Sequence, residues 1–181
     1  MTESRPDAGA ESAPVPSARV GGATGAGGAT GAGVSATASG FKLDESIGFL
    51  VYRTQLLMKK ELARQFRPHG ITPEQWAVLN RLWEEDSLTQ RQLADRTFKD
   101  QPTTARICGR LEDKGLVRRT PCPEDGRASR VALSDEAKDL IPELIPRAVR
   151  TIEKAVAGID PAEAAIARKV LAQMFENLES V

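Results

Sequence analysis

The stretch that decides the fold is LTQRQLADRTFKDQPTTARICGRLEDKGLVRRT, residues 88–120. Thr89 followed three residues later by Gln92 is the pattern of a capping box, which predicts that a short helix begins here and runs to about Thr97. A tight turn at 98–99 then separates this helix from a second one. Two short helices joined in this way are typical of a helix-turn-helix unit.

The second helix of the pair is expected from Pro102 to about Lys114, with Asp100 or Gln101 as its N-cap and Gly115 at its C-terminal end. Its inward side is expected to hold Thr104, Ile107, Cys108 and Leu111. Its outward side is expected to hold Pro102, Ala105, Arg106, Gly109 and Asp113, with Thr103 and Arg110 on one flank, and so mixes small residues with arginines. Small residues allow close approach in a DNA groove, and arginines donate to base edges and phosphates.

Residues 116–120 and 129–133 read as two short strands, and the segment between them contains prolines and Asp125-Gly126, which are turn signals. This pattern predicts a β-hairpin with basic sides and a basic tip. A helix-turn-helix followed by such a hairpin describes a winged helix-turn-helix. The hairpin is therefore the expected wing.

Helices are also expected on both sides of this unit. A long first helix follows Asp44 as its N-cap and stops before Pro68 and Gly70, and a second begins at Thr72-Pro73-Glu74-Gln75 and ends near Asp86. Ser134 opens a helix that contains Pro142 and Pro146, which should delay or kink it. Asp160 opens the last helix. The fold class predicted is mainly α, in the order α-α-α-α-β-β-α-α.

Composition divides the chain into a tail and a domain. Residues 1–40 contain 9 Gly and 10 Ala but no Leu, Ile, Phe, Trp or Tyr, so we expect a disordered tail there and a domain at 41–181. The 181 residues hold 25 basic and 25 acidic side chains. The basic ones are concentrated in the segment 87–134, with 10 basic against 6 acidic residues, whereas 135–181 has 6 against 9. Such a local basic excess is the pattern of a phosphate-contacting segment.

Several function classes are unsupported by the sequence. His69 is the single histidine, and two cysteines do not make a metal site or a disulfide framework, so we expect no metal and no cofactor. No phosphate-binding glycine loop or nucleophile with an evident base is present, which argues against an enzyme. No apolar run reaches the roughly 18 residues of a membrane span, and no signal sequence is visible. We expect a cytoplasmic protein without a membrane partner.

Over about residues 43–180 the sequence resembles the MarR-type transcriptional regulators. The resemblance is carried by four segments in the right order: Ile71–Trp76, Leu88–Ala94, Arg110–Arg119 and Asp125-Gly126-Arg127. Two departures from the family pattern are Asp135-Glu136-Ala137, in place of a glycine-containing turn after the wing, and the two prolines of the following helix.

The resemblance implies a homodimer that binds a pseudo-palindromic double-stranded DNA operator. Residues 87–134 would be the DNA-binding lobe, and residues 41–70 and 135–181 would be dimerisation helices. The last helices independently carry more apolar residues than one small lobe is able to bury, which favours a partner. A monomer in which these helices pack on each other is the alternative.

DNA-contacting roles follow from the same resemblance and from the helix faces. We expect Arg106 and Thr103 at base edges, Arg110 at phosphate, and Arg127 in the minor groove, positioned by Asp125. Arg118, Arg119 and Arg130 would contact the DNA backbone. The full candidate set is Thr89, Gln90, Pro102, Thr103, Thr104, Arg106, Arg110, Arg118, Arg119, Asp125, Arg127 and Arg130, although Thr104 is also suited to capping or packing.

The family often binds a small aromatic or phenolic acid effector, which lowers DNA affinity. The candidates for this site are Tyr52, Arg53, Phe66, His69 and Trp76, against the plainer reading that they are core, surface or loop residues. We expect a repressor released by such an effector. Two alternatives stay open: a regulator that senses oxidation through an exposed Cys122, with Cys108 only packing, and a winged-helix module that binds another protein.

Overall fold

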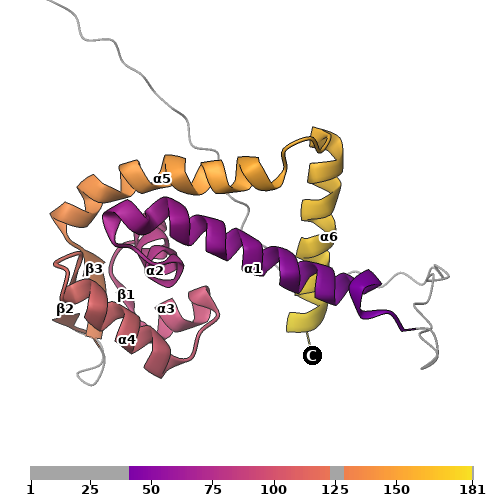
Figure 1. The fold of residues 1–181 in the computed structure, drawn as a ribbon. Helices are drawn as coiled ribbons and strands as arrows, with labels where there is room; N and C mark the ends of the chain where they lie inside the picture. The colour runs from indigo at the N-terminus through magenta and orange to yellow at the C-terminus, as the bar shows by residue number, and fades with distance from the viewer. Residues whose placement is uncertain (1–40, 123–128, 181) are drawn as a thin grey trace, which may run out of the picture. The chain divides into compact units, whose positions relative to one another are not determined.

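The computed structural model describes residues 41–122 and 129–180, and the chain divides into two units, residues 1–41 and 42–181. The second unit is mainly helical, which confirms the predicted fold class (Figure 1). Its elements are the short 3-10 helices η1 (Leu43–Glu45) and η2 (Arg67–His69), the helices α1 (Ile47–Phe66), α2 (Pro73–Glu84), α3 (Gln90–Thr97), α4 (Gln101–Glu112), α5 (Asp135–Ala155) and α6 (Pro161–Glu179), and the strands β1 (Leu88–Thr89), β2 (Val117–Pro121) and β3 (Ser129–Leu133).

The sheet has three strands, where the sequence predicted two. β1 pairs antiparallel with β3, Leu88 opposite Val131 and Thr89 opposite Arg130, and β3 pairs with β2, so the strand order is β1-β3-β2. The additional strand has two residues and lies next to the capping box of α3. Two residues are too few to show the alternation that predicts a strand from sequence. Through β1 the wing is joined to the start of the helix-turn-helix.

Helix ends follow the expected capping chemistry with one correction. Thr72 and Thr89 form complete capping boxes with Gln75 and Gln92, as predicted. The prediction that Asp44 caps α1 is wrong, because Asp44 lies within η1 and the Ser46 hydroxyl accepts from the Phe49 N–H at 3.3 Å. Each of these caps satisfies N–H groups that have no partner inside the helix.

α5 runs without interruption through Pro142 and Pro146, so the expectation that these prolines delay the helix is wrong, while the expected kink stays a prediction. Both prolines are exposed. Each proline removes one hydrogen bond to the carbonyl four residues earlier. Because the two positions are four apart and face solvent, water is able to hydrate the carbonyl groups left over, and the helix continues.

The core lies where α2, α3 and α4 meet the sheet and the ends of α1 and α5. Its largest completely buried side chains are Phe66, Val78, Leu79, Leu82, Leu88, Leu93, Leu111, Val117, Val131, Leu133, Ile141 and Leu144. α1 and α5 lie side by side, and their inner ends join this core (Figure 1). The winged lobe, by which we mean residues 87–134, is thus attached to a two-helix support.

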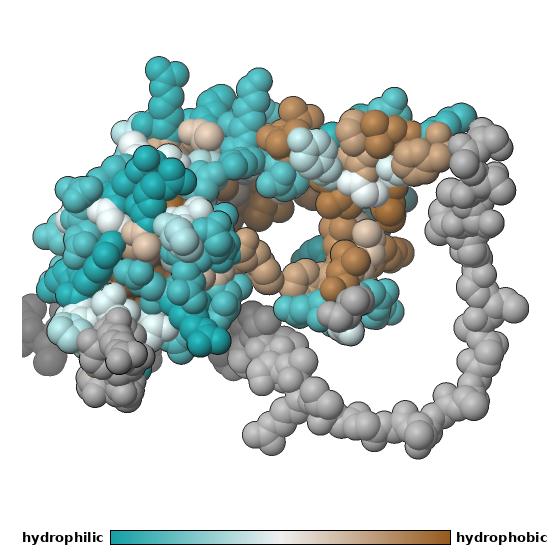
Figure 2. Space-filling model, turned by 90° about the horizontal axis from the view of Figure 1, so that it is seen from below, coloured by the Kyte–Doolittle hydropathy of each residue, from teal (hydrophilic) through white to brown (hydrophobic). Residues whose placement is uncertain are grey.

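The outer part of that support leaves apolar side chains uncovered. α6 has no buried residue, and Ile166, Val170, Leu171 and Leu178 on it are 44–77 % exposed. Ile47 and Leu57 on α1 are 56 % and 67 % exposed. In Figure 2, hydrophobic side chains gather over α6 and the adjoining end of α1, whereas the winged lobe presents mainly hydrophilic ones.

One contact joins α6 to the turn between α3 and α4. The rings of Phe98 and Phe175 meet edge to face, with their centroids 5.3 Å apart. Phe98 is the C-cap of α3 and adopts a left-handed conformation with φ of 52°. This conformation disfavours residues with a Cβ atom, so an aromatic side chain here is an unusual feature of the turn.

Candidate nucleic-acid interface

The outward face of α4 carries two arginines one turn apart. Arg106 and Arg110 are both exposed, and within the described residues neither has a carboxylate at ion-pair distance. Residues four apart lie on the same side of a helix, so both guanidinium groups extend from one face. Two unpaired guanidinium groups on one exposed face are suited to phosphate and base-edge acceptors.

The start of α4 is fixed by Asp100. Its carboxylate accepts from the Thr103 N–H at 2.6 Å and from the Thr103 hydroxyl at 2.9 Å. These two hydrogen bonds, the backbone one first, hold the pKa of Asp100 below its ordinary value. The hydroxyl proton of Thr103 is therefore committed to Asp100, and its oxygen is left as an acceptor. Pro102, also a candidate, is exposed in the first turn.

Thr104 requires a correction. It is completely buried, and its hydroxyl donates to the Asp100 carbonyl at 3.0 Å. Its side chain is thus unavailable to a ligand on the outer face, and it acts in packing and capping. Ile107, Cys108 and Leu111 share this buried side, as predicted.

Arg119 makes its contacts within the lobe, with its side chain 30 % exposed. Its Nη2 donates to the Ala105 carbonyl at 3.2 Å, and its Nε lies 3.1 Å from the Glu112 carboxylate. A Cβ atom at Gly109 would lie 3.3 Å from the same Nη2. Gly109 thus makes room for the arginine to cross α4, and this accounts for a small residue that the sequence attributed to DNA approach.

The other candidates on the wing and at the start of α3 divide into exposed residues and residues bonded within the lobe. Arg118 is exposed on β2 and has no ion-pair partner among the described residues. Arg130 on β3 donates from Nη1 to the Ser87 carbonyl at 2.8 Å, and Gln90 donates to the Ser129 hydroxyl at 3.4 Å. Arg118 therefore remains a candidate for DNA, whereas Arg130 and Gln90 already hold the wing to the start of α3. Asp125 and Arg127, expected at the wing tip, lie outside the described residues.

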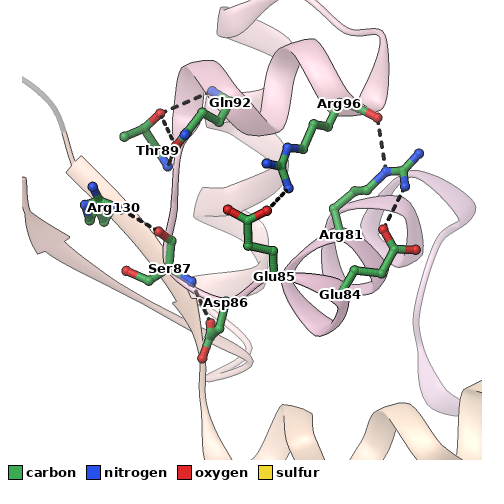
Figure 3. A network of polar contacts seen from close by, with 9 residues as sticks. All are labelled: Arg81, Glu84, Glu85, Asp86, Ser87, Thr89, Gln92, Arg96 and Arg130. Carbon is green, nitrogen blue, oxygen red and sulfur yellow. Dashed lines mark hydrogen bonds and ion pairs between the residues drawn. The ribbon is translucent and has the colours of Figure 1, made fainter. Parts of the chain in front are cut away.

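Figure 3 shows the polar corner that orients the wing, a feature that sequence analysis missed. Asp86 accepts from the Ser87 N–H at 2.9 Å and from the Leu133 N–H at 3.0 Å, so one carboxylate ties the end of α2 to β3. Beside it, Arg96 of α3 pairs with Glu85 at 2.7 Å, and Arg81 donates to the Arg96 carbonyl at 3.2 Å. Apart from the Asp86–Ser87 contact, these partners lie 11 or more residues apart in sequence, so no local pattern predicts them.

Both cysteines are buried, and this corrects the expectation for Cys122. Cys122 is 6 % exposed and Cys108 is 0 % exposed. Burial raises the pKa of the Cys108 thiol. A thiol that senses oxidants is accessible, so neither buried position matches that description.

The five effector candidates do not converge on one cavity. Phe66 is completely buried and packs on Trp76 with ring centroids 5.2 Å apart, while Tyr52 is 56 % exposed. His69 lies 3.9 Å from the Glu143 carboxylate. Trp76 and Arg53 line two different grooves beside the α1–α5 contact.

The groove that contains Trp76 has a volume of about 570 Å³. It is formed by α1, α2, α5, α6 and the turn between α3 and α4, with lining residues that include Val51, Met58, Trp76, Lys99, Ile152 and Leu171. We call it the tryptophan groove. Lys99, next to the N-cap of α4, gives this mostly apolar space a cation close to the interface helix.

The described residues offer neither a metal cluster nor a membrane-spanning helix. No three His, Cys, Asp or Glu side chains lie together there as a metal cluster. Across residues 41–122 and 129–180, no helix combines the length and apolar character that crossing a membrane requires.

The fold and the exposed arginine face define the class of winged-helix DNA-binding regulators, and comparison with known proteins agrees. The model of the MarR family matches residues 69–128. A probable transcriptional regulator from Pseudomonas aeruginosa is 31 % identical over 74 % of this chain and 99 % of its own, with a TM-score of 0.69. A MarR transcriptional regulator from Methanosarcina mazei is 30 % identical over 75 % and 98 %, with a TM-score of 0.70.

The chain belongs to the MarR family of transcriptional regulators. A further similar structure is the PcaV transcriptional regulator from Streptomyces coelicolor in complex with its natural ligand, at 27 % identity over 75 % of this chain and 96 % of that one, with a TM-score of 0.66. Members of the family bind DNA, and some bind small molecules. The family consists of regulators and not of enzymes.

Proposed function

We propose that the protein is a homodimeric repressor that binds a pseudo-palindromic operator through α4 and the wing. The observation that carries this proposal is the pair of exposed, unpaired guanidinium groups of Arg106 and Arg110 on one face of α4. In a winged helix-turn-helix this second helix enters the major groove. Arg118, and Arg127 of the expected wing tip, supply further contacts, and Thr103 and Pro102 approach the bases.

The dimer proposal rests on the uncovered apolar side chains of α6 and α1. A soluble protein seldom leaves such a surface uncovered, and a two-fold partner buries the same face of both chains. Two winged lobes related in this way would read two half-sites of one operator, separated by about one turn of DNA.

We further propose that a small aromatic or phenolic acid binds in the tryptophan groove and lowers DNA affinity. Trp76 offers an aromatic wall, and Lys99 offers a cation that has no ion-pair partner among the described residues. Lys99 directly precedes the N-cap of α4. A ligand that binds the Lys99 ammonium group therefore acts close to the recognition helix. The PcaV structure with its natural ligand supports ligand response in a related chain.

A fluorescence anisotropy titration against the DNA upstream of the protein's own gene tests the function. We expect tight binding that survives non-specific competitor DNA and weakens steeply with salt, because counterions are released from phosphates. Arg106→Ala and Arg110→Ala should each lower affinity, while Arg168→Ala, on the exposed face of α6, serves as the matched charge control. Failure to bind any operator in a genome-wide selection would favour a module that binds another protein.

Addition of 4-hydroxybenzoate to the same assay tests the effector site. The acid should release DNA from the wild type, and Lys99→Gln should need at least several times more acid. Quenching of tryptophan emission reports binding of the acid independently of DNA release. In Trp76→Phe this quenching should be lost, although Trp83 still emits. Equal release in wild type and Lys99→Gln would place the effector elsewhere.

A further inference from the structure

Arg119 lies on the core-facing side of the wing strand β2, which is an unusual place for a charged side chain. Successive side chains of a strand point to opposite faces of the sheet, so Arg119 shares its face with Val117 and not with Arg118. Val117 is buried, as is Val131, which lies opposite Arg119 on β3, whereas Arg118 is exposed. Well-packed apolar side chains often stabilise such a position as well as a paired charge does. Stability alone therefore does not account for an arginine here.

The guanidinium group of Arg119 contacts α4 at two places. Nη2 donates to the main-chain carbonyl of Ala105 at 3.2 Å, and Nε, which is shielded from solvent, lies 3.1 Å from the Glu112 carboxylate. Gly109 lies on the same side of the helix, and a Cβ atom there would be 3.3 Å from Nη2. A carbonyl oxygen has two lone pairs, so that of Ala105 accepts from Arg119 without giving up its hydrogen bond within the helix.

These contacts hold the helix beside both of its exposed arginines. Ala105 directly precedes Arg106, and Gly109 directly precedes Arg110. Apolar packing is non-directional, whereas a hydrogen bond weakens steeply as its angle changes, so the Arg119 bond resists rotation of α4 about its own axis. A rotation of about 20° would move a side chain at about 5–6 Å from the axis by about 2 Å. A displacement of that size breaks a hydrogen bond to a base edge.

We propose that Arg119 is a positioning residue that fixes the rotation of α4 relative to the wing and so selects the base edges that Arg106 reaches. The inference rests on the proposed function, and it assigns part of the sequence discrimination to a side chain that does not touch the bases. The charge of Arg119 is already paired with Glu112, so phosphate is not needed to balance it. An apolar residue of similar length would fill the gap and leave α4 free to rotate.

Anisotropy titrations of Arg119→Met test the proposal, with the DNA upstream of the protein's own gene and with single-base variants of that DNA. We expect discrimination between these DNAs to fall by about fivefold or more, the loss of one base contact, while the salt slope stays that of the wild type. Arg119→Lys should not restore discrimination, because an ammonium group lacks the planar fork of donors. Arg118→Met, on the other face of β2, is the matched control and should lose affinity but keep discrimination.

Gly109→Ala tests the same contact without removing a charge. The added methyl group should displace the Arg119 guanidinium group and lower discrimination, although alanine favours a helix more than glycine does. Weakening of the helix would therefore not explain the loss. Gly109→Ala combined with Arg119→Met should lose no more than Arg119→Met alone. Additive losses would mean that Gly109 approaches DNA itself, and would overturn its link to Arg119.

A pair of spin labels reports the position of α4 without DNA. Nitroxides attached to Gln101→Cys and Thr120→Cys lie at exposed positions of α4 and β2. We expect a narrow distribution of distances between them in the otherwise unchanged protein and in Arg118→Met, and a broader one in Arg119→Met. Urea unfolding shows that each variant is folded under the conditions of measurement.

Two results would overturn the proposal. A salt slope that falls by about 1 in Arg119→Met, with equal weakening for all DNAs, would make Arg119 a phosphate contact. Lower stability with unchanged discrimination and an unchanged distance distribution would make it a structural residue only. If the wild type selects no operator and Arg119→Met still broadens the distribution, the proposed function is contradicted and the positioning of α4 by Arg119 is supported.

Discussion

At the scale of single residues, the arginines of the winged lobe divide into two groups by their partners. Arg119 and Arg130 are bonded to backbone carbonyls of the lobe, whereas Arg106, Arg110 and Arg118 are exposed. Removal of a bonded arginine should lower stability, and removal of an exposed one should lower DNA affinity. The printed sequence alone does not separate these groups, since all five lie in basic, polar surroundings.

Arg106→Ala should relax sequence preference, because a base-edge contact is lost, while Arg118→Ala should weaken binding to all sequences alike and reduce the salt slope by about 1. Each base contact is worth about 1–3 kcal/mol of discrimination. Anisotropy titrations with the operator and with point-mutated operators measure both effects. Identical specificity in wild type and Arg106→Ala would remove Arg106 from base recognition.

The Phe98–Phe175 pair should couple the recognition unit to α6. An aromatic pair contributes about 0.5–1.5 kcal/mol beyond its buried area. A double-mutant cycle of Phe98→Ala and Phe175→Ala, measured by urea unfolding, should give a coupling energy in that range. Leu178→Ala, on the same helix, is the control partner. Additive effects of the two phenylalanine substitutions would show that the rings do not interact in solution.

Several residue roles were predictable because they depend on local spacing. The outward direction of Arg106 and the burial of Cys108 follow from helical periodicity. The role of Gly109 was not predictable, because it depends on Arg119 arriving from another element. Cys122 was misassigned for a similar reason: turn chemistry indicates an exposed loop, but the residue follows β2 directly and is buried.

At the scale of elements, Glu61 ties α1 to α5 through Lys154. Hydrogen bonds from Arg64, Lys154 and Gln65 lower the pKa of Glu61 from 4.5 to about 2. A carboxyl group with a depressed pKa stabilises the fold above its unfolded pKa, and this contribution is lost as the pH falls through the folded value. The relevant window is therefore about pH 4.5 down to about 2.

Glu61→Gln should lower the melting temperature at pH 7, and the difference from the wild type should shrink across that window. Thermal unfolding by circular dichroism over the pH series measures it. Glu179→Gln, in an exposed position of α6 for which no ion pair is found among the described residues, should show no such trend. A difference that stays constant down to pH 2 would contradict the ion-pair explanation.

Helix boundaries were largely predictable at this scale, because capping chemistry is local. The boxes at Thr72 and Thr89 and the cap at Asp100 are present as expected. β1 was not predictable, since two residues have no period and their strand character comes from β3. The effect of the two prolines on the start of α5 was overestimated. The free energy that each proline costs the helix depends on whether the freed carbonyl group faces water.

At the scale of the whole molecule, Val170 tests assembly. It is 44 % exposed on a helix that has no buried residue. Val170→Glu would place a charge on the proposed dimer face, so it should shift the sedimentation mass towards the monomer and weaken operator binding. Arg168→Glu, which changes charge at a polar exposed position, is the control. A dimer that survives Val170→Glu unchanged would place the interface elsewhere.

Deletion of residues 1–40 should leave the melting temperature nearly unaltered. Among the residues that the structure describes, the buried core runs from Phe66 to Leu144, well outside the deleted segment. Differential scanning calorimetry of the full chain and of residues 41–181 makes the comparison. A decrease of many degrees would show that the tail contributes to the fold.

The burial of Cys108 and Cys122 has a practical consequence for spectroscopy. The chain contains two cysteines, and both are shielded in the folded protein. A cysteine introduced at an exposed polar position, such as Lys169 on α6 or Gln101 at the start of α4, should therefore react with a maleimide dye or a nitroxide far faster than either native thiol. Distances between labels placed on these two helices would then report how the recognition helix moves when DNA or a small acid binds, without removal of the native cysteines.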